Sequence, residues 1–379
     1  MPDSFGFSEV AQSKARDYLY SGLASSAAKG ISIFLLALLG LSLQVSIGLE
    51  KAIAAYVNEP PLVVLFFTLI GLAVYWVLSL PFDYHRGYVL EHKFAVSNES
   101  LSSWFRDNLK MTALTDLMAL AFVQGIYGFM RMDLTYWWFY LWAVTAIAVA
   151  FFMYVSPVLI MPLFYKFPKL ENEELLDRLS KLAEKAGVKI LGVFEMKTGG
   201  KTRKAIAALT GIANTRRMLL SDTFLANYSN DETESVMAHE IGHHVHGHIW
   251  KLTLGLTSMI FVMLLVTSLV LPATSHFFGF ERFDSVATLP LFALILGLLY
   301  VAFTPLMNTI SRTAEGQCDQ YELELAEKPE AYISSMTKLC DQNLRLADPS
   351  ALIELLFYDH PSGKKRVKRA IAYKRLRGL

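Results

Sequence analysis

The sequence contains very little cysteine and carries almost no net charge. Cys318 and Cys340 are the only cysteines among 379 residues, too few for a disulfide framework or for a zinc site built from thiolates. Charged residues make up 18% of the chain, the formal net charge is +1, and no module of interleaved basic and aromatic residues occurs. There is also no internal repeat, low-complexity tract or glycine-rich phosphate loop. These absences argue against a nucleic acid partner and against a phosphate-loop nucleotide site.

Apolar residues, in contrast, are abundant. They make up 54% of the chain, and the mean hydropathy is +0.37. Six apolar runs are long enough to cross a bilayer as helices: residues 30–49, 62–80, 111–130, 136–154, 252–272 and 289–307. The polar segment before the first run is too long and too acidic to be a cleavable signal, so we expect the first run to remain as an anchor. The sequence thus predicts a mainly α fold, a polytopic helical bundle in an integral, multi-pass membrane protein.

The third of these runs carries two polar side chains, Asp116 and Gln124. They are eight residues apart and therefore share one face of a helix. Because lipid does not tolerate a charge, that face is expected to point into the bundle or toward water. We interpret the two side chains as hydrogen-bonding groups between helices.

The distribution of lysine and arginine predicts the orientation. With six spans, the segments on the side opposite the N-terminus carry only Lys51, Arg131 and Arg282, three of the 35 basic residues. The positive-inside rule then places both termini in the cytoplasm, in a bacterial inner membrane or in the endoplasmic reticulum. Basic residues near the C-terminus are expected to meet anionic lipid headgroups.

The most informative stretch is residues 230–250, where His239, Glu240 and His243 form the pattern HExxH. Two histidines four residues apart lie on the same face of a helix, so both imidazoles can bind one zinc ion. Glu240 follows directly and can accept a proton from water without being a ligand. Polar capping residues, an acidic first turn and the absence of proline predict one continuous helix over the stretch. The alternative interpretation is a solvated, histidine-rich helix face or an adventitious metal patch, since His244, His246 and His248 lie in the same segment.

A catalytic zinc site needs a third protein ligand and an open position. The longer pattern HExxHxxGxxH, which supplies a third histidine locally, does not continue here. Further along the chain, Glu315 and Asp319 lie four residues apart on a predicted helix. Glu315 is the candidate third ligand, and Asp319 is the candidate acceptor for the second nitrogen of a ligand histidine. Glu322 and Glu324 are rival candidates, unless they belong to a solvated helix face.

The chain divides into four predicted regions. Residues 1–164 form a membrane region with about four spans and an amphipathic, aromatic loop at 81–110 that we interpret as a cytoplasmic helical hairpin near the headgroups. Residues 165–251 form a small cytoplasmic α+β insert that carries the HExxH helix, and residues 252–307 contain two further spans. Residues 308–379 form a cytoplasmic region with the third ligand and a basic tail.

Within the insert, composition predicts a helix at 171–186, a strand at 189–196 and a hairpin with strands at 205–210 and 216–221. An extended peptide can add to the exposed strand of such a hairpin through main-chain hydrogen bonds. Ala207, Leu209 and Gly211 are the candidate substrate-binding residues on that strand. The alternative is that the hairpin only shields the HExxH helix.

In the C-terminal tail, His360 and Arg366 are candidates for hydrogen bonds to the oxyanion that forms during peptide hydrolysis.

Several motifs together resemble the integral-membrane zinc metalloproteases of the type I CAAX prenyl protease family. HEIGHHVHGH is similar to the family's HExGHxxxxH, and SRTAEGQCD to its SRxxExQAD, with Cys318 at the usual alanine position. YDHPSGKKR resembles the family's HP segment followed by an arginine. The segments PFDYHRGYVLEHKFAVS, PVLIMPLFYKFPKL and NTRRMLLSDTFL are also similar to family segments. The resemblance extends from about Leu62 to the C-terminal tail, and matches His248 and Gln317 among other positions.

The resemblance implies one Zn²⁺ per chain, bound by His239, His243 and Glu315, with Glu240 as the general base. It implies a metalloendopeptidase that cleaves peptide or protein substrates, including prenylated C-terminal tails, at the cytoplasmic face. Two departures stand out: the family usually has seven spans where six are predicted here, and the asparagine expected before the substrate strand is absent near Ala205.

Two alternatives remain at this stage. One is a membrane quality-control protease like HtpX, which also has HExxH and a downstream glutamate. The other is a membrane protein that binds metal through its histidine cluster without hydrolysis. The presence of Glu240 favours an enzyme, because metal binding alone does not require it.

Overall fold

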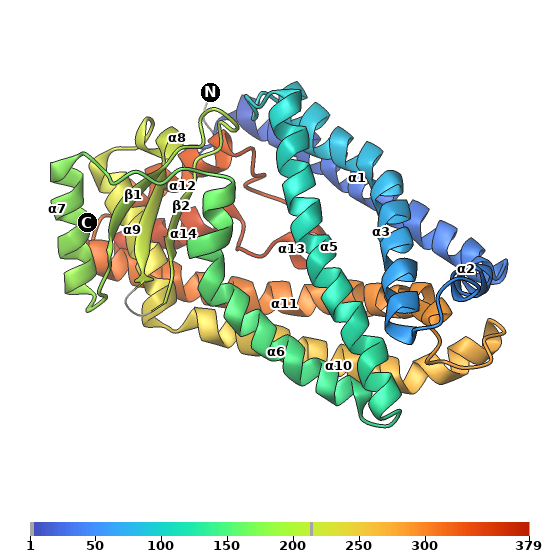
Figure 1. The fold of residues 1–379 in the computed structure, drawn as a ribbon. Coiled ribbons are helices and arrows are strands. Elements are labelled where there is room, and N and C mark those ends of the chain that lie inside the picture. The colour runs from blue at the N-terminus through green and yellow to red at the C-terminus, as the bar shows by residue number, and fades with distance from the viewer. Residues whose placement is uncertain (1–3, 213–214, 379) are drawn as a thin grey trace.

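A computed structural model describes residues 4–212 and 215–378. Within them, six helical segments are long and apolar enough to cross a membrane. They are built on α1 (Glu9–Ser42), α3 (Pro60–Tyr84), α5 (Leu101–Met132), α6 (Trp137–Val155), α10 (His248–Phe277) and α11 (Leu289–Ala326). Figure 1 shows the strands and most of the shorter helices gathered at one end, with these long helices extending away from it. The predicted mainly α membrane bundle is confirmed.

The first membrane helix differs from its prediction at both ends. α1 begins at Glu9, where Ser8 caps it by accepting a hydrogen bond from the Ala11 amide, so the polar N-terminal segment is part of the helix. The predicted run through residue 49 is wrong, because Gln44 adopts a left-handed conformation (φ 54°). A separate helix, α2 (Val45–Ala54), follows, and its Glu50 accepts a hydrogen bond from the Ser285 hydroxyl at 2.6 Å. The chain thus turns inside an uninterrupted apolar run, where α2 meets the connection between α10 and α11.

The region 81–110 is not the separate hairpin that was predicted. α3 continues through a π-helical turn (His85–Leu90) and α4 (Glu91–Lys93), and α5 begins at Leu101. Only a short connection lies between them, and a β-bridge between Ser97 and Thr202 joins it to the insert. The two membrane helices therefore reach the insert directly.

Gln124 on α5 confirms one predicted contact between helices. Its amide Nε2 donates to the Pro61 carbonyl on α3 at 2.9 Å. Asp116, two turns away, is half-buried. One of the two polar side chains on this face of α5 thus forms its hydrogen bond with a neighbouring helix.

After α6, a π-helical turn (Ser156–Ile160) and a 3₁₀ turn (Met161–Leu163) lead into the α+β insert. Its elements are α7 (Glu173–Lys185), β1 (Gly192–Met196), β2 (Ala207–Thr210), β3 (Arg217–Ser221) and α8 (Asp222–Leu225). The strand order is β1-β3-β2, with β3 parallel to β1 and antiparallel to β2. The predicted helix, strand and hairpin are confirmed, whereas residues 213 and 214 of the predicted turn lie outside the described residues.

The HExxH helix, α9 (Asn230–Val245), packs between the insert and α11. Ser229 and Glu232 form a reciprocal capping box at its start. Met237, Ala238 and Ile241 are fully buried in a core that also includes residues of α7, β2 and β3. The predicted continuous helix over 230–250 is wrong, because α9 ends at Val245 and α10 begins at His248, with Gly247 between them at φ 65°.

α11 joins the membrane region to the site. It runs without a break from the sixth span through Glu315 to Ala326, so the predicted span and the predicted ligand helix are a single element. Three helices follow: α12 (Pro329–Gln342), α13 (Ala351–Phe357) and α14 (Gly363–Arg377). Phe7 packs with Val367 of α14 in one buried cluster, so both ends of the described chain lie at the sheet-bearing end.

Candidate metal centre and active site

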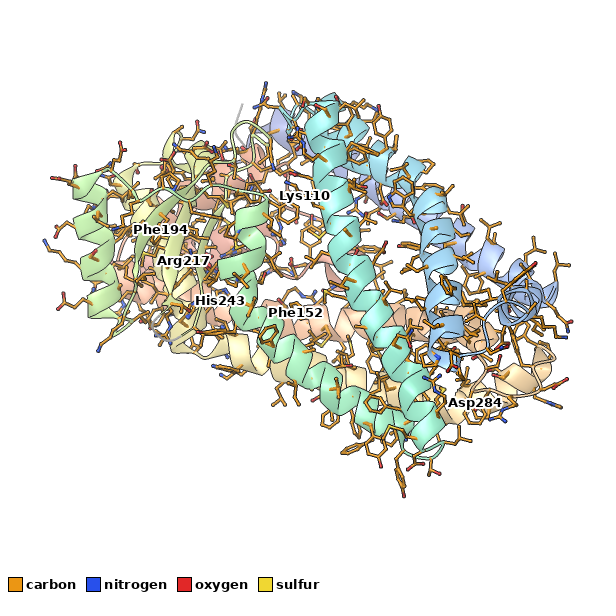
Figure 2. All side chains as sticks on the ribbon, viewed as in Figure 1. Lys110, Phe152, Phe194, Arg217, His243 and Asp284 are labelled. Atoms are coloured by element: carbon orange, nitrogen blue, oxygen red, sulfur yellow. The ribbon has the colours of Figure 1, made fainter. Side chains whose placement is uncertain are left out.

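Two helices bring the three predicted ligands together. α9 carries His239 and His243, and α11 carries Glu315. Gly242 permits the close approach, because a Cβ there would lie only 3.3 Å from the Cα of Cys318 on α11. Figure 2 shows His243 at the same end of the molecule as Phe194 and Arg217 of the sheet.

The Glu315 carboxylate faces the Nε2 atoms of both histidines. Its Oε2 lies 3.1 Å from His239 Nε2, and its Oε1 lies 3.3 Å from His243 Nε2. Glu315 and His239 are buried, and His243 is half-buried. Two imidazole nitrogens and one carboxylate converging in this way are a donor set that catalytic zinc sites use. The residues therefore fit a zinc ion.

On the other side of the His239 ring, Nδ1 meets an ionic cluster. Asp319 Oδ1 lies 3.3 Å from it, and Arg366 Nη2 lies 3.2 Å from it. Arg366 Nε also donates to Asp319 Oδ1 at 2.9 Å, and Arg369 donates to Asp319 Oδ2 at 2.8 Å. Asp319 thus lies behind His239, the candidate ligand, on the side of the ring away from Glu315. Arg366, predicted to face the oxyanion, contacts the imidazole nitrogen that points away from Glu315.

The electrostatics of the pocket favour a positive charge. Burial lowers the pKa of His239, but its hydrogen bonds with Asp319, Glu315 and Glu322 outweigh burial and hold the pKa well above its ordinary value. Several carboxylates around one imidazole therefore favour a cation here. A divalent metal ion satisfies the same requirement.

Other groups of potential ligands lie close by. His239, His243 and Cys318 form one set, and His239, Asp319 and Glu322 form another, with ligand atoms within 4.8 Å of one another in each. Glu322, a rival candidate in the sequence, lies 3.5 Å from His239 Nδ1 and accepts a hydrogen bond from Ser235. Because Glu315 lies within 3.3 Å of Nε2 of both histidines, it is the better candidate for the third ligand.

Glu324, the other rival, is exposed and accepts a hydrogen bond from Gln320 on its own helix. This is the solvated helix face that was the alternative for it. Glu240, in contrast, is half-buried and directly follows His239.

His360 approaches Glu315 from the C-terminal region. Its Nε2 lies 3.3 Å from Glu315 Oε1, and its Nδ1 is bonded to Asp359 at 2.8 Å. This hydrogen bond, together with the charges of His360 and Arg345, holds the pKa of Asp359 well below its ordinary value. The Asp359 carboxylate thus orients His360 with Nε2 directed at the ligand set.

β2 presents its free edge to the HExxH helix. The Ile206 carbonyl accepts a hydrogen bond from the Ser221 amide, so the main-chain polar groups of Ile206 point toward β3. Because main-chain groups alternate along a strand, the N–H and C=O groups of Ala207 and Leu209 point away from β3, toward the free edge. There, His244 Nε2 is bonded to the Leu209 carbonyl at 2.9 Å.

Gly211 follows β2 at φ 89°, and a Cβ there would lie 2.4 Å from the Thr215 carbonyl oxygen. The end of the predicted substrate strand therefore requires glycine.

Sequence reasoning assigned no contact to several residues near the site, including His244, Arg369 and Ser235. Each reaches its partner through the packing of separate elements, so spacing along the chain carries no signal for the contact. The sequence does draw attention to His244, because it directly follows His243 of the HExxH pattern, but it does not reveal the contact with Leu209.

Comparison with known proteins agrees with this geometry. The model of peptidase family M48 matches residues 169–374, and the model of the CAAX prenyl protease N-terminal region, with five membrane helices, matches residues 1–166. Four of the six candidate spans lie within residues 1–166, one fewer than that description names. The short helix α2 also lies in this region.

Individual relatives cover most of the chain. The uncharacterized metalloprotease YhfN of Bacillus subtilis (strain 168) is 30% identical over 301 residues, which cover 78% of this chain and 70% of YhfN. CAAX prenyl protease 1 of Saccharomyces cerevisiae is 27% identical over 315 residues, 77% of this chain and 68% of that protein.

The crystal structure of S. mikatae Ste24p has the same fold, with a TM-score of 0.84 at 23% identity, over 98% of this chain and 91% of that one. The chain therefore belongs to peptidase family M48 and is a multi-pass membrane metalloendopeptidase of the CAAX prenyl protease family.

Proposed function

We propose that this metalloendopeptidase is zinc-dependent, with one Zn²⁺ held by His239, His243 and Glu315. The observation that carries the proposal is the position of Glu315, whose two oxygens lie 3.1 and 3.3 Å from the Nε2 atoms of the two histidines. When bound, zinc supplies Lewis-acid chemistry by polarising a peptide carbonyl and acidifying a nearby water.

The chain's own residues carry the proton. Glu240, half-buried and directly after the proposed ligand His239 on α9, is the proposed group that takes a proton from the attacking water and then delivers it to the leaving amine. His360, oriented by Asp359, is the proposed donor to the developing oxyanion. For Arg366, its contacts with Asp319 and with His239 Nδ1 favour a positioning role behind the ligand over a direct contact with the oxyanion.

The proposed substrate binds as an extended strand along β2. Ala207 and Leu209 direct main-chain groups away from β3, and Gly211 closes the strand, so these three residues form the proposed pairing edge. The carbonyl of Leu209 is taken by His244, which leaves the remaining edge groups for a peptide.

The proposed substrate class is a C-terminal tail, including prenylated tails. A cavity of about 380 Å³ lies next to His360, because Asp359, which is hydrogen-bonded to His360, forms part of its lining. Arg86, Lys204 and Arg345 line it beside several leucine side chains. Lys204 is paired with Glu91 and Arg345 with Asp359, so Arg86 and the apolar walls are the features that suit a short apolar peptide ending in a free carboxylate.

The proposed orientation places the site and both termini at the cytoplasmic face, in contact with anionic lipid. Its support is that 32 of the 35 lysine and arginine residues flank the spans on one side. Protease protection of N- and C-terminal tags in sealed, oriented vesicles tests it, because only tags on the outside are removed.

Cleavage of three peptides by the purified chain in detergent tests the activity. They are a farnesylated CAAX peptide, its unprenylated twin and a farnesylated peptide with an amidated C-terminus. We expect zinc-dependent cleavage of the first, weaker cleavage of the others, and none by a Glu240→Gln variant. Cleavage of an unfolded membrane protein but of no CAAX peptide would favour a quality-control protease. Bound zinc without any proteolysis would favour a metal-binding protein.

A further inference from the structure

His248 and Gln317 lie behind the proposed ligand His243. His248 is buried, with 2% of its surface exposed, and its Nδ1 lies 3.3 Å from His243 Nδ1. Its other nitrogen, Nε2, lies 2.8 Å from the side-chain oxygen of Gln317. His243 in turn directs its Nε2 at Glu315. Gln317, His248 and His243 therefore form a chain of contacts that leads to the proposed metal position.

The donors and acceptors in this chain of contacts determine which nitrogen of each imidazole carries the proton. An amide oxygen can only accept, so His248 Nε2 carries the proton that is donated to Gln317. In the neutral imidazole, Nδ1 of His248 is then an acceptor. His243 Nδ1 must therefore carry the proton between the two rings, which leaves the lone pair of His243 on Nε2, the atom that faces Glu315.

The break between α9 and α10 creates the contact. On a continuous helix, a residue five positions after His243 would be rotated by about 140° from it and would face elsewhere. Gly247 interrupts the helix with φ 65°, and α10 begins at His248 in a new direction. His248 returns beside His243, while Gln317 comes from α11, the helix that also carries Glu315.

We propose that His248 and Gln317 are positioning residues for the metal, and that they hold His243 in the tautomer and ring orientation that zinc binding requires. The inference rests on the proposed ligand set. It gives the two histidines different supports, because His239 Nδ1 is backed by the carboxylate of Asp319 whereas His243 Nδ1 is backed by a neutral imidazole and an amide. Partners of this kind contribute about 10- to 100-fold to metal affinity.

Cys318 contacts the same nitrogen without replacing the proposed partner. Its Sγ lies 3.3 Å from His248 Nδ1. A thiol is a weak donor, so the imidazole N–H of His243 is the stronger partner for that lone pair. The two donors share the acceptor, and the orientation of His248 is still fixed by Gln317.

The test measures the Zn²⁺ dissociation constant of the full-length chain in detergent, by competition with a fluorescent chelator. His248→Phe keeps a ring of similar size but removes both nitrogens, and we expect the dissociation constant to rise about 10- to 100-fold. His248→Asn places an amide oxygen where Nδ1 lies, so it can accept from His243 and should recover most of the affinity. This rescue separates positioning from packing, because asparagine fills the space less well than phenylalanine.

Gln317 supplies a second pair of variants at an exposed position, where the fold tolerates substitution. Gln317→Leu removes the acceptor and should weaken zinc binding, whereas Gln317→Glu keeps an acceptor and should not. His246→Asn is the matched control for packing, because the His246 ring lies 5.4 Å from the rings of both Tyr321 and His248, and its replacement leaves both nitrogens of His248 in place. We expect it to bind zinc as the unmodified chain does.

Unchanged zinc affinity in both His248→Phe and Gln317→Leu overturns the proposal. So does an equal loss in His248→Phe, His248→Asn and His246→Asn, because that pattern reports damage to the turn rather than loss of one acceptor. Zinc affinity is measured apart from proteolysis, so an unmodified chain that binds zinc but cleaves no peptide would contradict the proposed function and leave this inference standing.

Discussion

His239 Nε2 and Glu315 Oε2 lie 3.1 Å apart although the two residues are separated by 76 positions in the chain. The helix that carries Glu315 is continuous with a membrane span, whereas the helix that carries His239 is anchored in the soluble core of the insert. The proposed metal centre thus lies where the membrane region and the insert meet. Its geometry depends on how closely α9 and α11 pack.

The first prediction concerns the third ligand. Glu315→Gln should weaken zinc binding by more than the roughly 100-fold that loss of a supporting residue costs, because a charged ligand is removed. Glu324→Gln, on the exposed face of the same helix, is the control and should bind zinc normally. Metal content after dialysis, with and without a chelator, measures both. Full zinc occupancy in Glu315→Gln would contradict the proposed ligand set.

The second prediction concerns the general base. Glu240→Gln should keep zinc and the fold, while kcat for peptide cleavage falls about 10²- to 10⁴-fold. Glu234→Gln, on the same helix but paired with Arg178 and Lys328, should change kcat little. Single-turnover kinetics with the farnesylated peptide compares the two variants. If Glu240→Gln cleaves at a near-normal rate, another group is the base.

The third prediction distinguishes the rival set that contains Cys318. Its thiol sulfur lies within 4.8 Å of ligand atoms of both histidines, and sulfur is a ligand that zinc accepts. If Glu315 is the ligand, Cys318→Ala should leave zinc content unchanged. Thiolate ligation can be read separately in the Co²⁺ protein, where a sulfur ligand gives a strong charge-transfer band. Loss of zinc from Cys318→Ala would move the assignment from Glu315 to the thiol.

Local sequence patterns predicted the parts of the site that depend on spacing along one helix. His239, Glu240 and His243 follow from helical geometry, and Asp319 follows from its place one turn after Glu315. The six spans were found from hydropathy, because length and apolar character are local properties. Their orientation and the ligand roles stay predictions.

The features that the sequence did not reveal depend on packing between distant elements. Gln44 and Gly247 break helices inside runs whose composition favours continuation, since the chain turns there to meet other elements. Arg366 lies 127 positions from His239, and the side of the ring that it contacts is set by the docking of α14. Residue type identified Arg366 as important, but only the fold gives its direction.

The fourth prediction concerns the buried ionic cluster. Asp319 is fully buried and accepts from Arg366 and Arg369. Asp319→Asn keeps the shape but leaves the buried Arg366 without its carboxylate, a change that typically costs about 3–5 kcal/mol. We expect a lower thermal unfolding temperature and weaker zinc binding, because the group that faces His239 Nδ1 changes from a carboxylate to a neutral amide. Thermal unfolding with and without excess zinc separates the two effects.

The last prediction concerns the packing of α9 against α11. A Cβ at Gly242 would lie 3.2 Å from Tyr321 and 3.3 Å from the Cα of Cys318, so Gly242→Ala must separate the two helices by a few tenths of an ångström. Catalytic geometry tolerates displacements of only about 0.5 Å, so zinc affinity and kcat should both fall. Gly255→Ala is the control, because its Cβ would meet only the flexible Met307 side chain, at 3.4 Å. If Gly242→Ala retains full zinc affinity and kcat, the spacing of these helices does not set the geometry of the site.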